Sequence, residues 1–256
     1  MRSEKTNPFG EVRAKRWMRN FLAHFGYRLT RITPDIYADE FVREMICRAR
    51  PYTITSPERM VAMWDATRYL SRYQIPGAIV ECGVWRGGSM MIAAMALLRD
   101  HEERDLFLFD TYEGMPEASA IDRDIYGWSG DARIRTNARA DGSWLSVSVE
   151  EVQQNMESTG YSPRLIHYVR GLVEDTVPSS APERIALLRL DTDWYQSTKH
   201  ELEHLVPRMT SNGVLIIDDY GHWEGARNAV DEYFNKSDRP TLLCPIDYTG
   251  RLAVIG

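Results

Sequence analysis

Seven short apolar runs follow one another in the last 180 or so residues of the chain, and most of them are nearly continuous. Such runs are typical of strands buried on both faces of a sheet. Segments with helical periodicity fill several of the gaps. The alternation predicts an α/β fold in which helices cover both faces of a mostly parallel sheet. The apolar runs are Ala78–Cys82, Leu106–Phe109, Leu165–Val169, Ile185–Leu190, Val214–Ile217, Thr241–Cys244 and Leu252–Ile255, and the helical segments are Ser89–Leu98, Val149–Met156, Ser197–Arg208 and Gly225–Phe234.

The beginning of the chain has a different, basic character. Residues 1–31 hold eight Lys and Arg against two Glu, and apolar residues between Val12 and Leu29 recur at helical spacing. We interpret residues 1–51 as an N-terminal helical arm or lid. It would pack on the body of the protein or on a second subunit, or attach loosely to an anionic membrane surface. Residues 52–256 would form one α/β domain, since 43% apolar residues suffice for one large core.

Composition argues against several classes of protein. With a net charge of −6, the chain as a whole lacks the excess of positive charge that is typical of proteins that bind nucleic acid. Cys47, Cys82 and Cys244 lack the spacing of a disulfide framework or a zinc ribbon, which fits a reducing cytoplasm. No apolar run approaches the roughly 18 residues of a membrane span, and the polar start does not look like a signal peptide. We expect a soluble cytoplasmic protein without stable membrane insertion.

A glycine-rich turn follows the first apolar run, with the sequence Gly83-Val84-Trp85-Arg86-Gly87-Gly88-Ser89. Glycines suit a sharp turn from strand to helix where a ligand approaches the backbone, although a purely structural turn would look the same. The spacing departs from the dinucleotide fingerprint. Asp110 ends the next run and is placed to accept ribose hydroxyls, or else to cap a helix or turn. Glu81 would repel phosphate but suit the cationic groups of S-adenosylmethionine.

Two further runs end in pairs of carboxylates. Asp191-Thr192-Asp193 follows one run and Asp218-Asp219 follows the next. Because the carboxyl ends of parallel strands share one edge of a sheet, these groups should converge there. Like charges so close need compensation, and an all-oxygen set favours Mg²⁺, Mn²⁺ or Ca²⁺ over zinc. Solvated strand-end carboxylates are the alternative.

A second metal motif competes with this interpretation. His200-Glu201-Leu202-Glu203-His204 matches H-E-x-x-H, the zinc motif of metallopeptidases. Here Leu202, Leu205 and Val206 must pack on the sheet, so we expect the His and Glu positions to face solvent largely. We therefore favour a solvated helix face over a zinc site.

Residues 111–148 form a long gap between two runs and are rich in Gly, Asp, Arg, Ser and Trp. Loops of this length are uncommon without a function. With Tyr126, Trp128 and Trp144, the segment is our candidate for a lid over the acceptor, with an ordinary packed insertion as the alternative. His222 and Trp223 could border the same acceptor or make ordinary turn contacts.

Four motifs carry a resemblance to a known family: Val80–Gly88, Asp110–Met115, Leu188–Asp193 and Ile216–Tyr220. Over roughly residues 52–255 the chain resembles the macrocin O-methyltransferase family, the TylF/MycF type of sugar O-methyltransferases in macrolide and aminocoumarin biosynthesis. The resemblance implies a class I methyltransferase (Rossmann-like) sheet of seven strands and S-adenosylmethionine as the cofactor. The cofactor-binding residues would be Glu81, Cys82, Gly83, Trp85, Gly87, Ser89, Asp110, Thr111 and Gly171.

The resemblance also implies Mg²⁺ (or Mn²⁺) held by Asp191, Asp218 and Asp219, with either Asp191 or Asp193 as the base. The expected activity is metal-assisted methylation of a hydroxyl on a small, sugar-bearing acceptor by a homo-oligomer. A catechol or phenol O-methyltransferase is the nearest alternative, since it would use the same metal and cofactor. A non-catalytic nucleotide-binding protein and the zinc peptidase are further alternatives.

Overall fold

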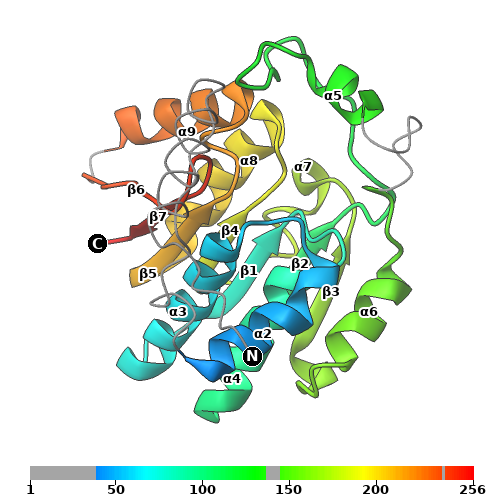
Figure 1. Cartoon of the computed structure of the whole chain (residues 1–256). Coiled ribbons are helices and arrows are strands. Elements are labelled where there is room, and N and C mark those ends of the chain that lie inside the picture. The colour runs from blue at the N-terminus through cyan, green and yellow to red at the C-terminus, as the bar shows by residue number, and fades with distance from the viewer. Residues whose placement is uncertain (1–38, 137–144, 238–239) are drawn as a thin grey trace, which may run out of the picture. The chain divides into compact units, whose positions relative to one another are not determined.

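The computed structural model describes residues 39–136, 145–237 and 240–256, in which seven strands form one sheet of order β3-β2-β1-β4-β5-β7-β6 (Figure 1). The first five strands along the chain are parallel, and β7 runs antiparallel to both β5 and β6. The predicted class I architecture is confirmed. The strands are β1 (Ala78–Cys82), β2 (Leu106–Asp110), β3 (Ile166–Arg170), β4 (Ile185–Leu190), β5 (Met209–Ile217), β6 (Cys244–Pro245) and β7 (Arg251–Val254).

Two predicted strands differ in extent from the observed ones. The run at Val214–Ile217 is the end of a longer strand that begins at Met209. The run at Thr241–Cys244 is mostly not strand, because only Cys244 and Pro245 pair with β7. This short edge strand includes a proline, which lacks the N–H needed to extend a ladder.

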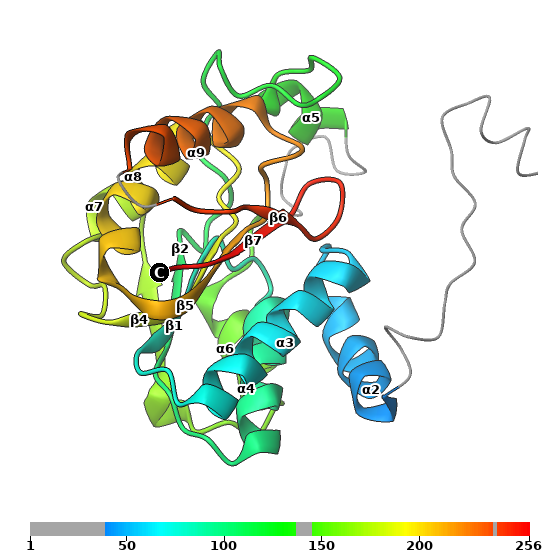
Figure 2. The ribbon, with the colours of Figure 1, turned by 90° about the vertical axis from the view of Figure 1, so that its left-hand side faces the viewer.

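Apart from α5, which lies beyond the carboxyl ends of the strands, the α-helices form two layers on opposite faces of the sheet (Figures 1 and 2). Ile79 belongs to the core under α2, α3, α4 and α6, whereas its neighbour Val80 belongs to the core under α7, α8 and α9. Ile216 and Ile217 alternate in the same way, as successive strand residues must. The helices are α2 (Glu40–Ala49), α3 (Pro57–Tyr73), α4 (Gly88–Asp100), α5 (Gly130–Thr136), α6 (Val149–Glu157), α7 (Val173–Thr176), α8 (Tyr195–Leu205) and α9 (Glu224–Lys236).

The region before β1 contributes two of these helices. Ser56 begins α3 as its N-cap, because its hydroxyl accepts a hydrogen bond from the Arg59 amide, and Pro57 fills the first helical position. Helix α2 buries apolar side chains in the core shared with α3 and α4, and it belongs to the same compact unit, 39–256. The division predicted between residues 51 and 52 stays a prediction, and the helix expected within residues 12–29 lies outside the described residues.

None of the helices in the described ranges is long and apolar enough to cross a membrane.

Candidate functional site

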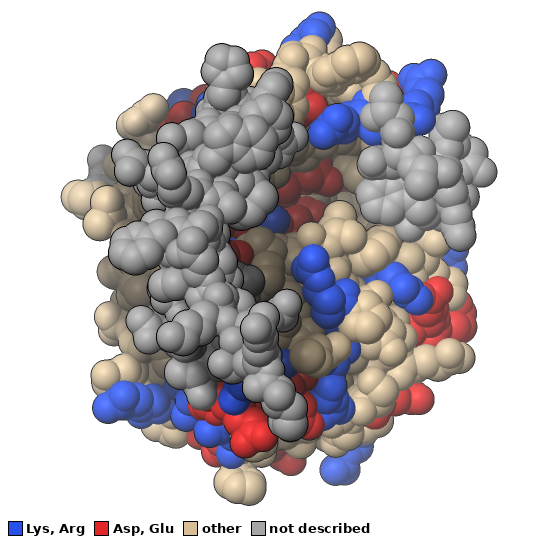
Figure 3. All heavy atoms as spheres, viewed as in Figure 1, with Lys and Arg blue, Asp and Glu red and all other residues tan. Residues whose placement is uncertain are grey.

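A cavity of about 410 Å³ opens at the carboxyl ends of the parallel strands. It lies where the strand order reverses between β1 and β4, which is where open α/β sheets bind ligands. The surface is hollowed on this face, and acidic side chains lie within the hollow (Figure 3). The predicted site residues that line the cavity are Gly83, Trp85, Ser89, Asp110, Thr111, Gly171, Asp191, Asp193, Asp218 and Asp219.

Three predicted cofactor residues lie behind the cavity wall. Glu81 and Cys82 are almost completely buried. Gly87 is the N-cap of α4, and a Cβ atom added to it would lie 3.2 Å from Val152 Cγ1. The Glu81 carboxylate pairs with Arg189 inside the protein, and burial raises its pKa to about 7. The role of these three residues in cofactor binding stays a prediction, and any part that Glu81 plays would act from behind the wall.

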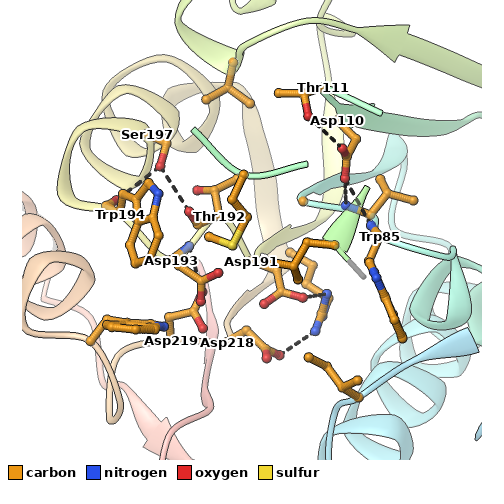
Figure 4. A pocket seen from close by; sticks show the side chains of 18 of the residues that line it. Trp85, Asp110, Thr111, Asp191, Thr192, Asp193, Trp194, Ser197, Asp218 and Asp219 are labelled. Atoms are coloured by element: carbon orange, nitrogen blue, oxygen red, sulfur yellow. Dashed lines mark hydrogen bonds and ion pairs between the residues drawn. The ribbon is translucent and has the colours of Figure 1, made fainter. Parts of the chain in front are cut away.

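Asp110 braces the glycine turn from the neighbouring strand. Its Oδ2 accepts hydrogen bonds from the Val84 and Trp85 amides, at 2.7 and 3.0 Å (Figure 4). Its Oδ1 accepts from the Tyr112 amide at 2.8 Å, and the Thr111 hydroxyl lies 3.4 Å from the same oxygen. The three amide bonds use three of the roughly four acceptor positions of a carboxylate, so the turn role exists in the structure. Ribose binding by Asp110 stays a prediction.

The carboxylates of Asp191, Asp218 and Asp219 converge at the other end of the cavity (Figure 4). One oxygen from each lies within 4.8 Å of the others, and within the described residues this is the one such cluster of His, Cys, Asp or Glu. Burial and the neighbouring carboxylates raise the pKa of Asp191 and of Asp219 well above the ordinary value. Burial, together with Asp191, raises the pKa of Asp193 to about 7.

Arg189 lies at the centre of this cluster and was missed by our sequence reasoning. Its guanidinium is 3% exposed and contacts Glu81 Oε1 at 2.5 Å, Asp191 Oδ2 at 2.7 Å and Asp218 Oδ1 at 2.6 Å. A signal was present, because a charged residue in a strand buried on both faces needs a buried partner. In the register of the sheet, Glu81 on β1 lies opposite Arg189 on β4.

A second guanidinium reaches the cluster from α3. Arg59 contacts Asp218 and also pairs with Asp247, in the turn between β6 and β7, at 3.0 Å. Arg59 and Arg189 thus face a larger number of buried carboxyl groups. A hard divalent cation fits the oxygen chemistry of this set, and it would share Asp218 with the two arginines, which pair with both of its oxygens.

Aromatic side chains line the cavity next to the acidic cluster (Figure 4). Trp194 and Trp223 are buried against each other, with ring centroids 4.9 Å apart, and Trp194 Nε1 donates to the Pro116 carbonyl at 3.0 Å. His222 lines the cavity, and its Nδ1 lies 3.3 Å from the Tyr248 hydroxyl. His222 and Trp223 thus line the cavity, and their amides also make turn contacts with the Asp219 carbonyl, so contact with an acceptor stays a prediction.

The described part of the 111–148 segment is packed rather than loose. Asp122 is 1% exposed, and its Oδ1 accepts a hydrogen bond from the Tyr195 amide at the start of α8, at 2.8 Å. Tyr126 and Trp128 are exposed and do not line the cavity. Other residues of the segment, among them Met115, Pro116 and Ile134, do line the cavity, so the lid over an acceptor stays a prediction. Trp144 lies outside the described residues.

The H-E-x-x-H motif does not form a metal site. His200 Nε2 lies 2.9 Å from the Val177 carbonyl oxygen, and among the described residues neither histidine belongs to a cluster of potential ligands. Our expectation that its Glu positions face solvent is wrong for Glu201, which is 0% exposed. Glu201 is buried because α8 lies with this residue over the Asp191–Asp193 turn, where Thr192 donates a hydrogen bond to it.

Comparisons with known proteins agree with this geometry. The sequence model described as "Macrocin-O-methyltransferase (TylF)" matches residues 43–252. A demethyldecarbamoylnovobiocin O-methyltransferase of Streptomyces niveus is 32% identical over 204 residues, 79% of this chain and 75% of that protein. A Streptomyces olivaceus 4'-O-methyltransferase of a rhamnosyl tetracenomycin C is 36% identical over 178 residues, 69% of this chain and 65% of that protein. The solved structure of the O-methyltransferase NovP superposes with a TM-score of 0.69 at 30% identity, covering 80% of this chain and 82% of that one.

Proposed function

This chain belongs to the macrocin O-methyltransferase family of S-adenosylmethionine-dependent enzymes, and on that premise we propose that it methylates a sugar hydroxyl with the help of a divalent cation. One observation carries the proposal: the glycine turn and the acidic cluster are two walls of the same cavity. A cationic methyl donor at the first wall and a hydroxyl at the second would then be neighbours. The sugar part of the proposal rests on the rhamnosyl acceptor in one relative's name.

We assign a different role to each group of cavity residues according to its chemistry. Ser89, at the first turn of α4, and Gly171 lie with the glycine turn at the cofactor end. When bound, Mg²⁺ or Mn²⁺ would lower the pKa of an acceptor hydroxyl. Asp191 or Asp193 would take the proton of that hydroxyl, and the oxygen would attack the methyl group in line with the departing sulfur.

Alignment of the bound donor and acceptor would also increase the rate of methyl transfer. Positioned reactants can contribute on the order of 7–11 kcal/mol to lowering a barrier. The buried Trp194 and Trp223 pair offers a rigid apolar surface that excludes water and restricts how an acceptor ring can lie.

The test is a turnover assay with purified protein, S-adenosylmethionine and three acceptors: the rhamnosyl tetracenomycin and the demethyldecarbamoylnovobiocin of the relatives' names, and catechol. We expect a mass increase of one methyl group on a glycosylated acceptor, and loss of that product when EDTA replaces Mg²⁺. Preferential methylation of catechol would support the phenol-type alternative instead. Cofactor binding without turnover on any acceptor would support a non-catalytic protein.

Three further expectations belong to the proposal. They are assembly into a homo-oligomer, location in the cytoplasm and the absence of nucleic-acid binding. Each stays a prediction that size measurement, cell fractionation or a gel-shift experiment would test.

A further inference from the structure

Glu201 is a completely buried carboxyl group for which the activity described so far has no use. It lies on α8 with 0% of its surface exposed, and within the described ranges no Lys, Arg or His forms a salt bridge with it. Buried carboxyl groups without a cation are costly and persist where hydrogen bonds satisfy them. Its contacts therefore indicate what it does.

Glu201 lies close to both turns that form the site. The Thr192 hydroxyl donates to its two oxygens, at 3.0 and 3.2 Å, and the buried Cys82 interacts electrostatically with the same carboxyl group. Thr192 is the middle residue of the Asp191–Asp193 turn, and Cys82 directly precedes Gly83. Glu201 is thus hydrogen-bonded to the turn after β4 and lies near the end of β1.

The turn that Glu201 contacts needs such support. Asp193 has a φ of 65°, a left-handed conformation that costs a non-glycine residue of the order of 1 kcal/mol or more. The Trp194 amide donates to the Thr192 carbonyl at 2.7 Å, which holds the backbone of the turn from the C-terminal side. Side chains hold the same turn as well: the Asp193 amide donates to Asp219, and the Thr192 hydroxyl donates to Glu201.

We propose that Glu201 is a positioning residue that holds the Asp191–Asp193 turn against the glycine turn, in the conformation that can bind a cation. This inference rests on the metal-dependent function proposed above. Burial, with help from Glu174 and Asp219, raises the pKa of Glu201 well above its ordinary value, so an uncharged amide of the same shape should replace it. The role therefore predicts that Gln at this position is tolerated and that an apolar side chain is not.

The test measures Mn²⁺ binding by electron paramagnetic resonance, with S-adenosylhomocysteine binding measured by calorimetry alongside. Glu201→Met and Thr192→Val each remove one partner of the hydrogen bond. We expect each to weaken Mn²⁺ binding on the order of 10-fold, the lower end of the cost of losing an outer-shell partner. Glu201→Gln should bind Mn²⁺ like the wild type, and the double variant should bind no more weakly than either single one.

Glu203→Met is the matched control, because Glu203 lies on the same helix and is exposed. It should leave Mn²⁺ binding unchanged. If Glu201→Met does not fold, Thr192→Val decides the question, because it only replaces a hydroxyl with a methyl group.

The outcomes separate the two claims. Folded Glu201→Met or Thr192→Val protein that binds Mn²⁺ as tightly as the wild type would overturn the positioning role and leave the proposed function intact. Wild-type protein that does not bind Mn²⁺ would overturn the proposed metal dependence and this inference together. Equal loss in Glu201→Gln and Glu201→Met would also overturn the role, since it requires the hydrogen bond rather than the charge.

Discussion

Gly83 and Asp191 touch at the centre of the site, so closely that a Cβ atom on Gly83 would lie 1.9 Å from the Asp191 carbonyl oxygen. The Asp191 amide also donates to the Cys82 carbonyl at 2.9 Å, which joins the ends of β1 and β4. The backbone of the glycine turn and that of the acidic turn are therefore in direct contact. In the function proposed above, this contact would make the methyl donor and the acceptor hydroxyl neighbours.

The first prediction concerns this contact. Gly83 has a φ of 81°, so Gly83→Ala would strain the turn and also push Asp191 away. We expect binding of both S-adenosylhomocysteine and Mn²⁺ to weaken, measured by calorimetry. Gly160→Ala is the matched control, because Gly160 has a φ of 82° with no atom within 4 Å of an added Cβ. That variant should lose some stability and bind both ligands normally; similar losses in both variants would contradict the argument.

The second prediction separates the two aspartates at the end of β5. Asp219→Asn should weaken Mn²⁺ binding by more than the roughly 10–100-fold typical of outer-shell changes, and abolish Mg²⁺-dependent turnover. It should also raise the melting temperature of the metal-free protein, because burial and the nearby Asp193 and Asp218 disfavour the ionised Asp219. Asp218→Asn should lose metal binding too, yet lower the melting temperature, since it deprives Arg189 and Arg59 of a buried partner.

Cofactor affinity is the internal control for these two variants. It should stay close to that of the wild type, because neither carboxylate lies at the cofactor end of the cavity. Undiminished Mn²⁺ binding in Asp219→Asn protein would remove it from the set of ligands.

The third prediction tests what Asp110 does. Asp110→Ala leaves the Val84, Trp85 and Tyr112 amides without their acceptor, so we expect a loss of stability as well as weaker cofactor binding. Adenosine and 2',3'-dideoxyadenosine, compared by calorimetry on the wild type, separate the two roles. If Asp110 binds a ribose hydroxyl, the wild type will prefer adenosine and the variant will not. Equal binding of both nucleosides by the wild type would leave Asp110 with the turn role alone.

Much of this site was predictable because of where strands end. Asp191, Asp218 and Asp219 each follow a buried apolar run, and in a parallel sheet such residues must meet at one edge. Gly83 and Asp110 follow from the same rule. The strand-end pattern thus identifies which backbone positions converge, whatever the details of packing.

Side-chain direction was not predictable in the same way. Glu81 and Arg189 lie within apolar runs, and only the register of β1 with β4 places them opposite each other. Glu201 belongs to a motif whose polar positions we expected to face solvent. It is buried because of the way α8 is rotated about its axis. Register and helix rotation arise from packing among distant segments, which periodicity along one segment does not encode.

The fourth prediction concerns the acceptor side. Asp122 accepts the hydrogen bond of the first amide of α8, that of Tyr195, from 73 positions away, and its Oδ1 lies against Gly225 at the start of α9 as well. Asp122→Ala should lose roughly 1 kcal/mol or more of stability and raise KM for the acceptor while cofactor affinity stays constant. Ser148→Ala is the matched control, since Ser148 is the N-cap of α6 and does not line the cavity, so the variant should lose stability without a change in KM. An unchanged KM in Asp122→Ala protein would show that α8 does not position the acceptor end.

The fifth prediction is a pH dependence that a divalent cation removes. Burial raises the pKa of Glu81 and of Asp193 to about 7, above ordinary values of 4.5 and 3.8, so the folded protein holds their protons more tightly than the unfolded chain does. Their contribution to stability is full below the unfolded pKa and is lost as the pH rises toward 7.

Urea unfolding of metal-free protein at pH 5.5, 6.5 and 7.5 should show this fall, and Asp193→Asn should make it shallower. The pKa values of Asp191 and Asp219, two of the proposed ligands, are raised as well, so protons and cations compete for their oxygens, and Mg²⁺ should raise the melting temperature more at pH 7.5 than at pH 5.5. An increase of the same size at both pH values would mean that Mg²⁺ binds somewhere other than these carboxylates.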